Sequence, residues 1–135
     1  MAAFQPFRDV APEELAAGLS AGTEWWVVDV RSKAERLRDG VIPGAMHLDS
    51  ALATPAAVAA ALRALPAGAR HVVFHCTRSQ SRGPAVAAVA AAVVAQSSSL
   101  LLDVGVLTGG FTAWRRRYFR TRPDLVADLT HPSHL

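Results

Sequence analysis

The stretch HCTRSQSRGP, from His75 to Pro84, contains the only cysteine of this 135-residue chain. Five residues separate Cys76 from Arg82, and a Gly-Pro pair follows the arginine. A cysteine thiolate is a strong nucleophile, and a guanidinium offers two parallel N–H donors that match the oxygens of a tetrahedral oxyanion. We therefore predict that Cys76 attacks an oxyanion that Arg82 binds.

The residues between Cys76 and Arg82 suit an anion-binding loop. Small side chains let the backbone curl so that its N–H groups point inward, and a helix that starts next adds free N–H groups and the positive end of its dipole. This field lowers the pKa of a thiol below its usual value of about 8.5. We also expect a hydroxyl of Ser79 or Ser81 to donate to the sulfur. The predicted oxyanion-binding residues are Thr77, Arg78, Ser79, Gln80, Ser81 and Arg82.

The alternative for a lone cysteine is an inert, buried side chain, because free cysteine is among the most buried residue types. That alternative leaves the polar run TRSQSR after an apolar strand unexplained, so we favour the functional interpretation. A single cysteine excludes an intramolecular disulfide and a cysteine-based zinc site, and we expect no bound metal.

The segments around the loop predict alternating helices and buried strands. Compact apolar runs predict strands over residues 25–30, 71–75 and about 100–106. Helices are expected over about 9–22, 54–65, 83–96 and 111–119, with Thr54 as an N-cap and Gly109–Gly110 opening the last one. The tail from Thr121 has no clear period, and we expect it to be partly loose.

This alternation favours an α/β fold with a parallel sheet and helices on both faces. In such sheets ligands bind beyond the carboxyl ends of the strands. Cys76 directly follows the predicted strand that ends at His75. The fold class therefore places the predicted nucleophile where an α/β protein binds its ligand.

Composition excludes several other classes. Hydrophobic residues make up 51% of the chain, so we expect a folded domain. The longest apolar run, residues 85–95, is too short to span a bilayer, and the first residues do not resemble a signal peptide. The basic run RRRYFR, Arg115 to Arg120, is interpreted as the solvated end of a helix rather than a nucleic-acid site. We expect a cytoplasmic protein, with a nuclear location also open, and no nucleic-acid or membrane partner.

The loop resembles the H-C-x5-R motif of cysteine-dependent phosphatases. More narrowly, it is similar to the H-C-x-x-S-x-x-R loop of the rhodanese-like branch that holds the M-phase inducer dual-specificity phosphatases and the eukaryotic arsenate reductases. Two further stretches agree. Residues 27–48, VVDVRSKAERLRDGVIPGAMHL, are similar to the rhodanese stretch D-x-R followed by G-H-I-P-G-A, and residues 109–114, GGFTAW, to its closing G-G-[FY]-x-x-W.

The resemblance covers about residues 8–119 and implies a single rhodanese-like domain over residues 1–135, with a C-terminal tail at 120–135. It implies a three-layer fold with a central parallel five-stranded sheet and helices on both faces. It also implies that Cys76 is the nucleophile, that residues 77–81 form the backbone cradle and that Arg82 binds the oxyanion. The residues that it marks as structural are Asp29, Arg31, Gly109, Gly110 and Trp114.

The sequence departs from the family pattern at several points. Val41 replaces the usual histidine, and Thr77 and Arg78 replace acidic residues of the phosphatase loop, so the loop supplies no acid. The second cysteine that protects the first in the phosphatases is absent. His131 and His134 in the tail have no cysteine beside them and make a poor metal site.

Loop length separates the reactions of this fold. The resemblance implies that sulfurtransferases of this fold usually have four residues between the cysteine and the next basic residue. The five residues between Cys76 and Arg82 form a wider loop, which fits phosphate or arsenate. SQSRGP is closer to the reductase loops than to the S-x-E-R phosphatase loops, so we expect reduction of arsenate to arsenite. The resemblance then implies glutathione as external reductant, glutaredoxin as a partner and no bound cofactor. The alternatives are a protein tyrosine or dual-specificity phosphatase, a sulfurtransferase, and an idle binding module, which the intact Cys76–Arg82 pair disfavours.

Overall fold

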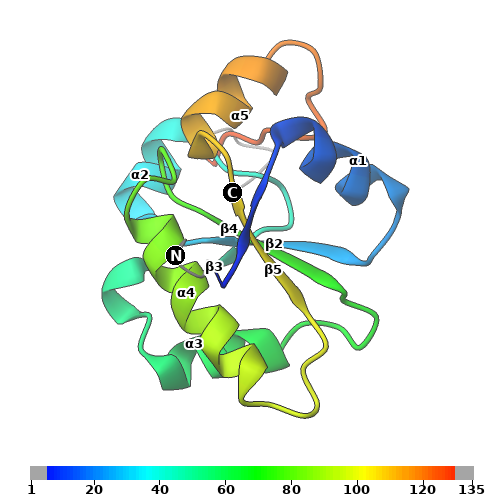
Figure 1. Cartoon of the computed structure of the whole chain (residues 1–135). Coiled ribbons are helices and arrows are strands. Elements are labelled where there is room, and N and C mark those ends of the chain that lie inside the picture. Colours follow the sequence, from blue (N-terminus) through cyan, green and yellow to red (C-terminus); the bar gives the residue numbers. More distant parts are fainter. Residues whose placement is uncertain (1–5, 130–135) are drawn as a thin grey trace, which may run out of the picture.

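A computed structural model of the chain, described here for residues 6–129, contains one five-stranded sheet in the order β1-β5-β4-β2-β3 (Figure 1). All four strand pairings are parallel. The strands are β1 (Arg8–Val10), β2 (Trp25–Asp29), β3 (Met46–His47), β4 (His71–His75) and β5 (Asp103–Leu107). The predicted parallel sheet is confirmed, including its three central strands. The five strands that the resemblance implies are also confirmed, but the positions of the edge strands β1 and β3 were not predicted, because two or three residues are too few to show a period.

Helices cover both faces of the sheet, as predicted (Figure 1). On one face lie α1 (Pro12–Ala21) and α5 (Gly110–Tyr118), and on the other α3 (Pro55–Arg63) and α4 (Arg82–Ala95). Side chains of β2 and β4 alternate between the two layers: Val27 and Val73 pack on the α1 and α5 side, and their neighbours on the α3 and α4 side. Among residues 6–129 no helix is both long and apolar enough to cross a membrane.

A short helix, α2 (Lys33–Asp39), follows β2 and had no predicted counterpart. None of its seven residues is buried, so it has no apolar period to detect. A capping box starts it: the Ser32 hydroxyl accepts from the Glu35 N–H at 3.2 Å, and the Glu35 carboxylate accepts from the Ser32 N–H at 3.0 Å. The S-x-x-E spacing was therefore the available signal for this helix.

The segment after α5 is packed rather than loose. Leu125 and Ala127 are buried, and the Trp114 indole N–H donates to the Leu125 carbonyl at 2.8 Å. Ala127 and Val41 exchange two backbone hydrogen bonds at 2.8 and 2.9 Å. The tail was expected to be partly loose, but its described part is held at Leu125 and Ala127 by partners distant in sequence, which no local period reveals. His131 and His134 lie outside the described residues.

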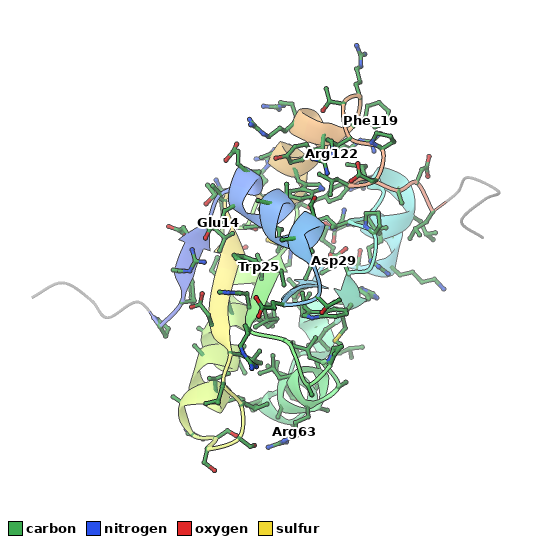
Figure 2. All side chains as sticks on the ribbon, turned by 90° about the vertical axis from the view of Figure 1, so that its right-hand side faces the viewer. Glu14, Trp25, Asp29, Arg63, Phe119 and Arg122 are labelled. Atoms are coloured by element: carbon green, nitrogen blue, oxygen red, sulfur yellow. The ribbon has the colours of Figure 1, made fainter. Side chains whose placement is uncertain are left out.

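A buried ion pair lies at the carboxyl end of β2, near the middle of the molecule (Figure 2). Arg31 donates to both Asp29 oxygens at 3.0 and 2.8 Å and to the Gly40 carbonyl at 2.8 Å. Burial raises the pKa of Asp29, but the Arg31 hydrogen bonds and nearby positive charge outweigh it and lower that pKa to about 2. The pair therefore stabilises the fold above about pH 4, and this stabilisation is lost as the pH falls towards 2.

Asp29→Asn should destabilise the protein by about 3–5 kcal/mol, because it leaves the Arg31 charge buried without a counter-charge. Urea unfolding followed by tryptophan fluorescence measures this change. The matched control is Asp124→Asn, which removes an exposed partner of Arg122 and should leave the unfolding midpoint unchanged. Equal midpoints for the two variants would contradict a structural role for the buried pair.

Candidate active site

Cys76 follows β4 at the carboxyl edge of the sheet, and its side chain is buried, at 3% exposure. Its carbonyl accepts from the Phe111 N–H at 3.0 Å, and the Thr77 carbonyl accepts from the Thr112 N–H at 2.9 Å. In a trans peptide the N–H points away from the carbonyl. Because both carbonyls face the first turn of α5, the N–H groups of the next two residues face the inside of the loop.

Gly110 makes this contact between α5 and the loop possible. A Cβ at this position would lie 2.5 Å from the Thr77 oxygen and 2.7 Å from the Cys76 oxygen. Its φ of +61° is also a left-handed value that favours glycine. The glycine that the resemblance marked as structural therefore contacts residues 76–82, the active loop, directly.

Backbone N–H groups surround the Cys76 sulfur. The Ser79 N–H donates to Sγ at 3.1 Å. The N–H groups of Arg78 and Gly83 also lower the pKa of the thiol. Ser79 reaches this position with a φ of +55°, unusual for a residue other than glycine, and such strain clusters at functional sites. Burial raises the pKa of the Cys76 thiol, but the three N–H groups and the Arg82 charge outweigh it, so the net pKa is lowered.

The expected serine hydroxyl donor to the sulfur is not seen. Ser79 supplies its backbone N–H instead, and its buried hydroxyl has no hydrogen-bond partner among residues 6–129. Ser81 is exposed. The sequence predicted N–H groups that point into the loop, but which of them reaches the sulfur depends on the backbone conformation of Ser79.

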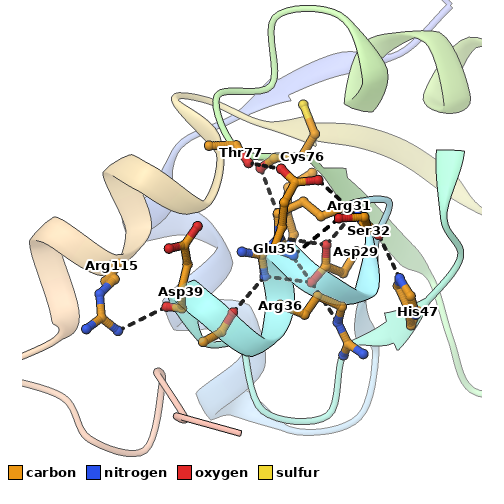
Figure 3. A network of polar contacts seen from close by, with 12 residues as sticks. Asp29, Arg31, Ser32, Glu35, Arg36, Asp39, His47, Cys76, Thr77 and Arg115 are labelled. Carbon is orange, nitrogen blue, oxygen red and sulfur yellow. Dashed lines mark hydrogen bonds and ion pairs between the residues drawn. The ribbon is translucent and has the colours of Figure 1, made fainter. Parts of the chain in front are cut away.

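The carboxylate of Glu35 is the main site residue that the sequence analysis missed. Arg82 donates to both of its oxygens, at 2.6 and 2.8 Å. The Thr77 hydroxyl also donates to it, at 2.7 Å (Figure 3). Glu35 reaches the loop from α2, 47 positions before Arg82 in the sequence. Only the pairing of β2 with β4, in which Asp29 lies beside His75, brings α2 and the loop together.

The geometry makes Glu35 a positioning residue for Arg82. The hydrogen bonds from Arg82 are the largest influence on the Glu35 pKa, and they lower it strongly despite partial burial. Glu35 therefore stays ionised near neutral pH and cannot donate a proton. Bidentate pairing fixes the plane of the guanidinium, whose remaining N–H groups stay available to an oxyanion.

A cavity of about 300 Å³ opens over this loop. Five of the six predicted oxyanion-binding residues line it, together with Cys76, Glu35 and Arg38: Thr77, Arg78, Gln80, Ser81 and Arg82. Ser79 does not line the cavity, and its backbone N–H contacts the Cys76 sulfur instead. Glu35 is the only carboxylate that lines this cavity within the described part of the chain.

His75 braces the loop from the core. It is fully buried, and burial lowers its pKa, so the ring is neutral near pH 7. Its Nδ1–H donates to the Cys76 carbonyl at 3.0 Å, while Nε2 stays 3.9 Å from Asp29. The first residue of the HC motif therefore helps to hold the same carbonyl that α5 holds.

The rate of Cys76 alkylation by iodoacetamide, measured against pH, should show a midpoint below the value of about 8.5 of a free thiol, since only the thiolate reacts. Alkylation of the protein unfolded in urea is the control and should show the ordinary midpoint. A folded midpoint at or above the unfolded one would mean that burial dominates the pKa.

Glu35→Gln should lower kcat/KM for an oxyanion substrate roughly 10- to 100-fold, because Arg82 loses its fixed orientation. Glutamine still completes the capping box, so the helix should survive. Glu13→Gln, which removes an exposed partner of Arg117, is the matched control and should leave kcat/KM unchanged. Wild-type kinetics in Glu35→Gln would exclude the positioning role.

Comparison with known proteins places this geometry in a family. The rhodanese-like domain family matches residues 11–117. No curated protein sequence matches the chain significantly. Among solved structures, the As-Sb reductase from Leishmania major has 27% identity and a TM-score of 0.83, over 96% of this chain and 90% of that one.

Two other structures share the fold at lower identity. Ygr203w, described as a yeast protein tyrosine phosphatase of the rhodanese family, has 24% identity and a TM-score of 0.76, over 93% of this chain and 95% of that one. A thiosulfate sulfurtransferase from Pseudomonas aeruginosa has 21% identity and a TM-score of 0.60, over 82% of this chain and 19% of that one. The family match, together with the parallel sheet and the loop after β4, shows that the chain belongs to the rhodanese-like domain family.

Proposed function

We propose that this protein reduces arsenate to arsenite, with Cys76 as nucleophile, Arg82 and the backbone of residues 77–82 as the oxyanion site, and glutathione as the external reductant. Glutaredoxin is a candidate partner for the last thiol exchange. A reducing compartment such as the cytoplasm suits this chemistry, because it keeps both thiols reduced.

The observation that carries the proposal is the state of Glu35. A phosphatase needs an acid that protonates the leaving alcohol or phenol. The only carboxylate that lines the cavity, among residues 6–129, is held ionised by Arg82 and Thr77. Arsenate brings its own hydroxyl protons near neutral pH, so its oxygen can leave as water without a protein acid.

The steps balance with two thiols. The Cys76 thiolate attacks arsenic, forming an S–As bond while one oxygen leaves as water. A glutathione sulfur then attacks the Cys76 sulfur, so that an S–S bond forms and the S–As bond breaks. Its electron pair stays on arsenic, which leaves as arsenite. A second thiol, from glutathione or glutaredoxin, attacks the mixed disulfide and restores the Cys76 thiolate.

Similarity also supports this reading, since the chain matches an As-Sb reductase along nearly its whole length at 27% identity. A second candidate is a phosphatase of the same fold, which the five-residue loop favours because its width suits a phosphate group. Sulfur transfer remains a third candidate, and an idle binding module is disfavoured by the lowered pKa of Cys76.

A parallel assay of the purified protein tests these candidates. It compares arsenate with glutathione and glutaredoxin, an aryl phosphate, and thiosulfate with cyanide. We expect arsenate reduction to dominate, and Cys76→Ser to lower its rate at least about 10³-fold by removing the nucleophile. Circular dichroism should show that this variant stays folded. An unchanged rate of arsenate reduction in Cys76→Ser would contradict the proposal. So would wild-type protein that turns over the aryl phosphate faster than it reduces arsenate.

A further inference from the structure

A second hollow, the α5 groove, lies beside the active loop. It has a volume of about 550 Å³ and is lined by residues of both turns of α5, from Phe111 to Arg117, by the residues that follow this helix, by Asp39 at the end of α2, and by Thr77. Thr77 also lines the cavity over Cys76. The α5 groove therefore adjoins the cavity that contains the Cys76 sulfur, and its volume is typical of a small-ligand site.

The groove carries an excess of positive charge. Four arginines line it, and one of them, Arg117, is paired with Glu13 at 3.0 Å. The other three are Arg115, Arg116 and Arg120, and none of them forms an ion pair with a carboxylate of residues 6–129. Asp39, the acidic residue of the lining, is already paired with Arg38 at 2.9 Å.

The helix dipole alone does not account for this arrangement. Cations in the last turn of α5 are favoured by the dipole, which explains why arginines occur there. It does not explain why Arg115 is held in place, with its guanidinium 4.2 Å from the Phe119 ring and an N–H on the Asp39 carbonyl at 3.1 Å. Phe119 itself is 52% exposed, so the groove pairs fixed positive charge with an open aromatic face.

We propose that the α5 groove binds the small anionic thiol that reduces Cys76, a glutathione-class molecule whose two carboxylates meet Arg116 and Arg120. This inference rests on the proposed function, in which the chain's single cysteine leaves the electrons to an external thiol. Carboxylates are the natural partners of unpaired guanidinium groups. The thiol end then lies at Thr77, where its sulfur attacks the Cys76 sulfur and releases arsenic with the S–As electron pair.

The kinetic test uses the double variant Arg116→Gln/Arg120→Gln. Both positions are exposed, so the fold should persist. We expect KM for glutathione to rise about tenfold, as for the loss of two exposed charge contacts. KM for arsenate and for the uncharged thiol 2-mercaptoethanol should change less than about twofold. The control Arg63→Gln/Arg70→Gln removes the same charge away from the groove; Arg63 lies at the opposite end of the molecule from Phe119 (Figure 2). It should behave as wild type.

A binding test separates this inference from the proposed function. S-methylglutathione keeps both carboxylates but cannot react, and calorimetry on the wild-type chain should detect its binding, weakened about tenfold in the Arg116→Gln/Arg120→Gln variant. If S-methylglutathione binds but the protein does not reduce arsenate, the result supports a thiol site in the α5 groove and contradicts only the proposed reductase activity. Absent binding, or equal binding in both proteins, would overturn the groove. Tighter binding of an acidic phosphopeptide, lost in the double variant, would also overturn it in favour of a peptide site.

Discussion

The active loop depends on two backbone hydrogen bonds from the first turn of α5. They hold the Cys76 and Thr77 carbonyls on the outside of the loop, and planar trans peptides then direct the following N–H groups inward. One of them, the Arg78 N–H, acts together with the N–H groups of Ser79 and Gly83 to lower the pKa of a sulfur whose pKa burial would otherwise raise. The lowered pKa of Cys76 therefore depends on peptide orientation, and for the Arg78 N–H that orientation is set by a helix more than thirty residues further along the chain. Gly110 permits the approach, because any side chain there would meet both carbonyl oxygens.

A second layer, made of buried polar residues beneath the loop, stabilises the strand ends that carry it. The Asp29–Arg31 pair and the neutral His75 lie under the loop, at the ends of β2 and β4, and both are shielded from water. The charges of this layer satisfy one another, which is the condition for burying them. A rigid base of this kind keeps the N–H groups of the loop aimed at one point, as a preorganised oxyanion site requires.

The charged and thiol groups around Cys76 determine which chemical steps the protein can carry out by itself. Glu35 holds Arg82, so it is not a free acid, and the lone thiol has no second cysteine beside it. In the proposed reaction the site binds an oxyanion and attacks it, and proton donation and electron supply fall to the substrate and to an external thiol. The arginine-rich α5 groove adjoins the loop at Thr77.

The sequence by itself determined the layer order, the three central strands and the pair Cys76–Arg82, because apolar runs, turn residues and a nucleophile spaced from an arginine are local patterns. Only the tertiary structure decided how the site works. The role of Glu35 arises from the register of β2 against β4. The sequence predicted inward N–H groups, but only the structure shows that Ser79 reaches the sulfur through its N–H and not its hydroxyl. The packed segment around Leu125 and Ala127 likewise depends on Trp114 and Val41, partners that are distant in sequence. Local patterns encode which groups are present, whereas strand register and helix docking decide which of them meet.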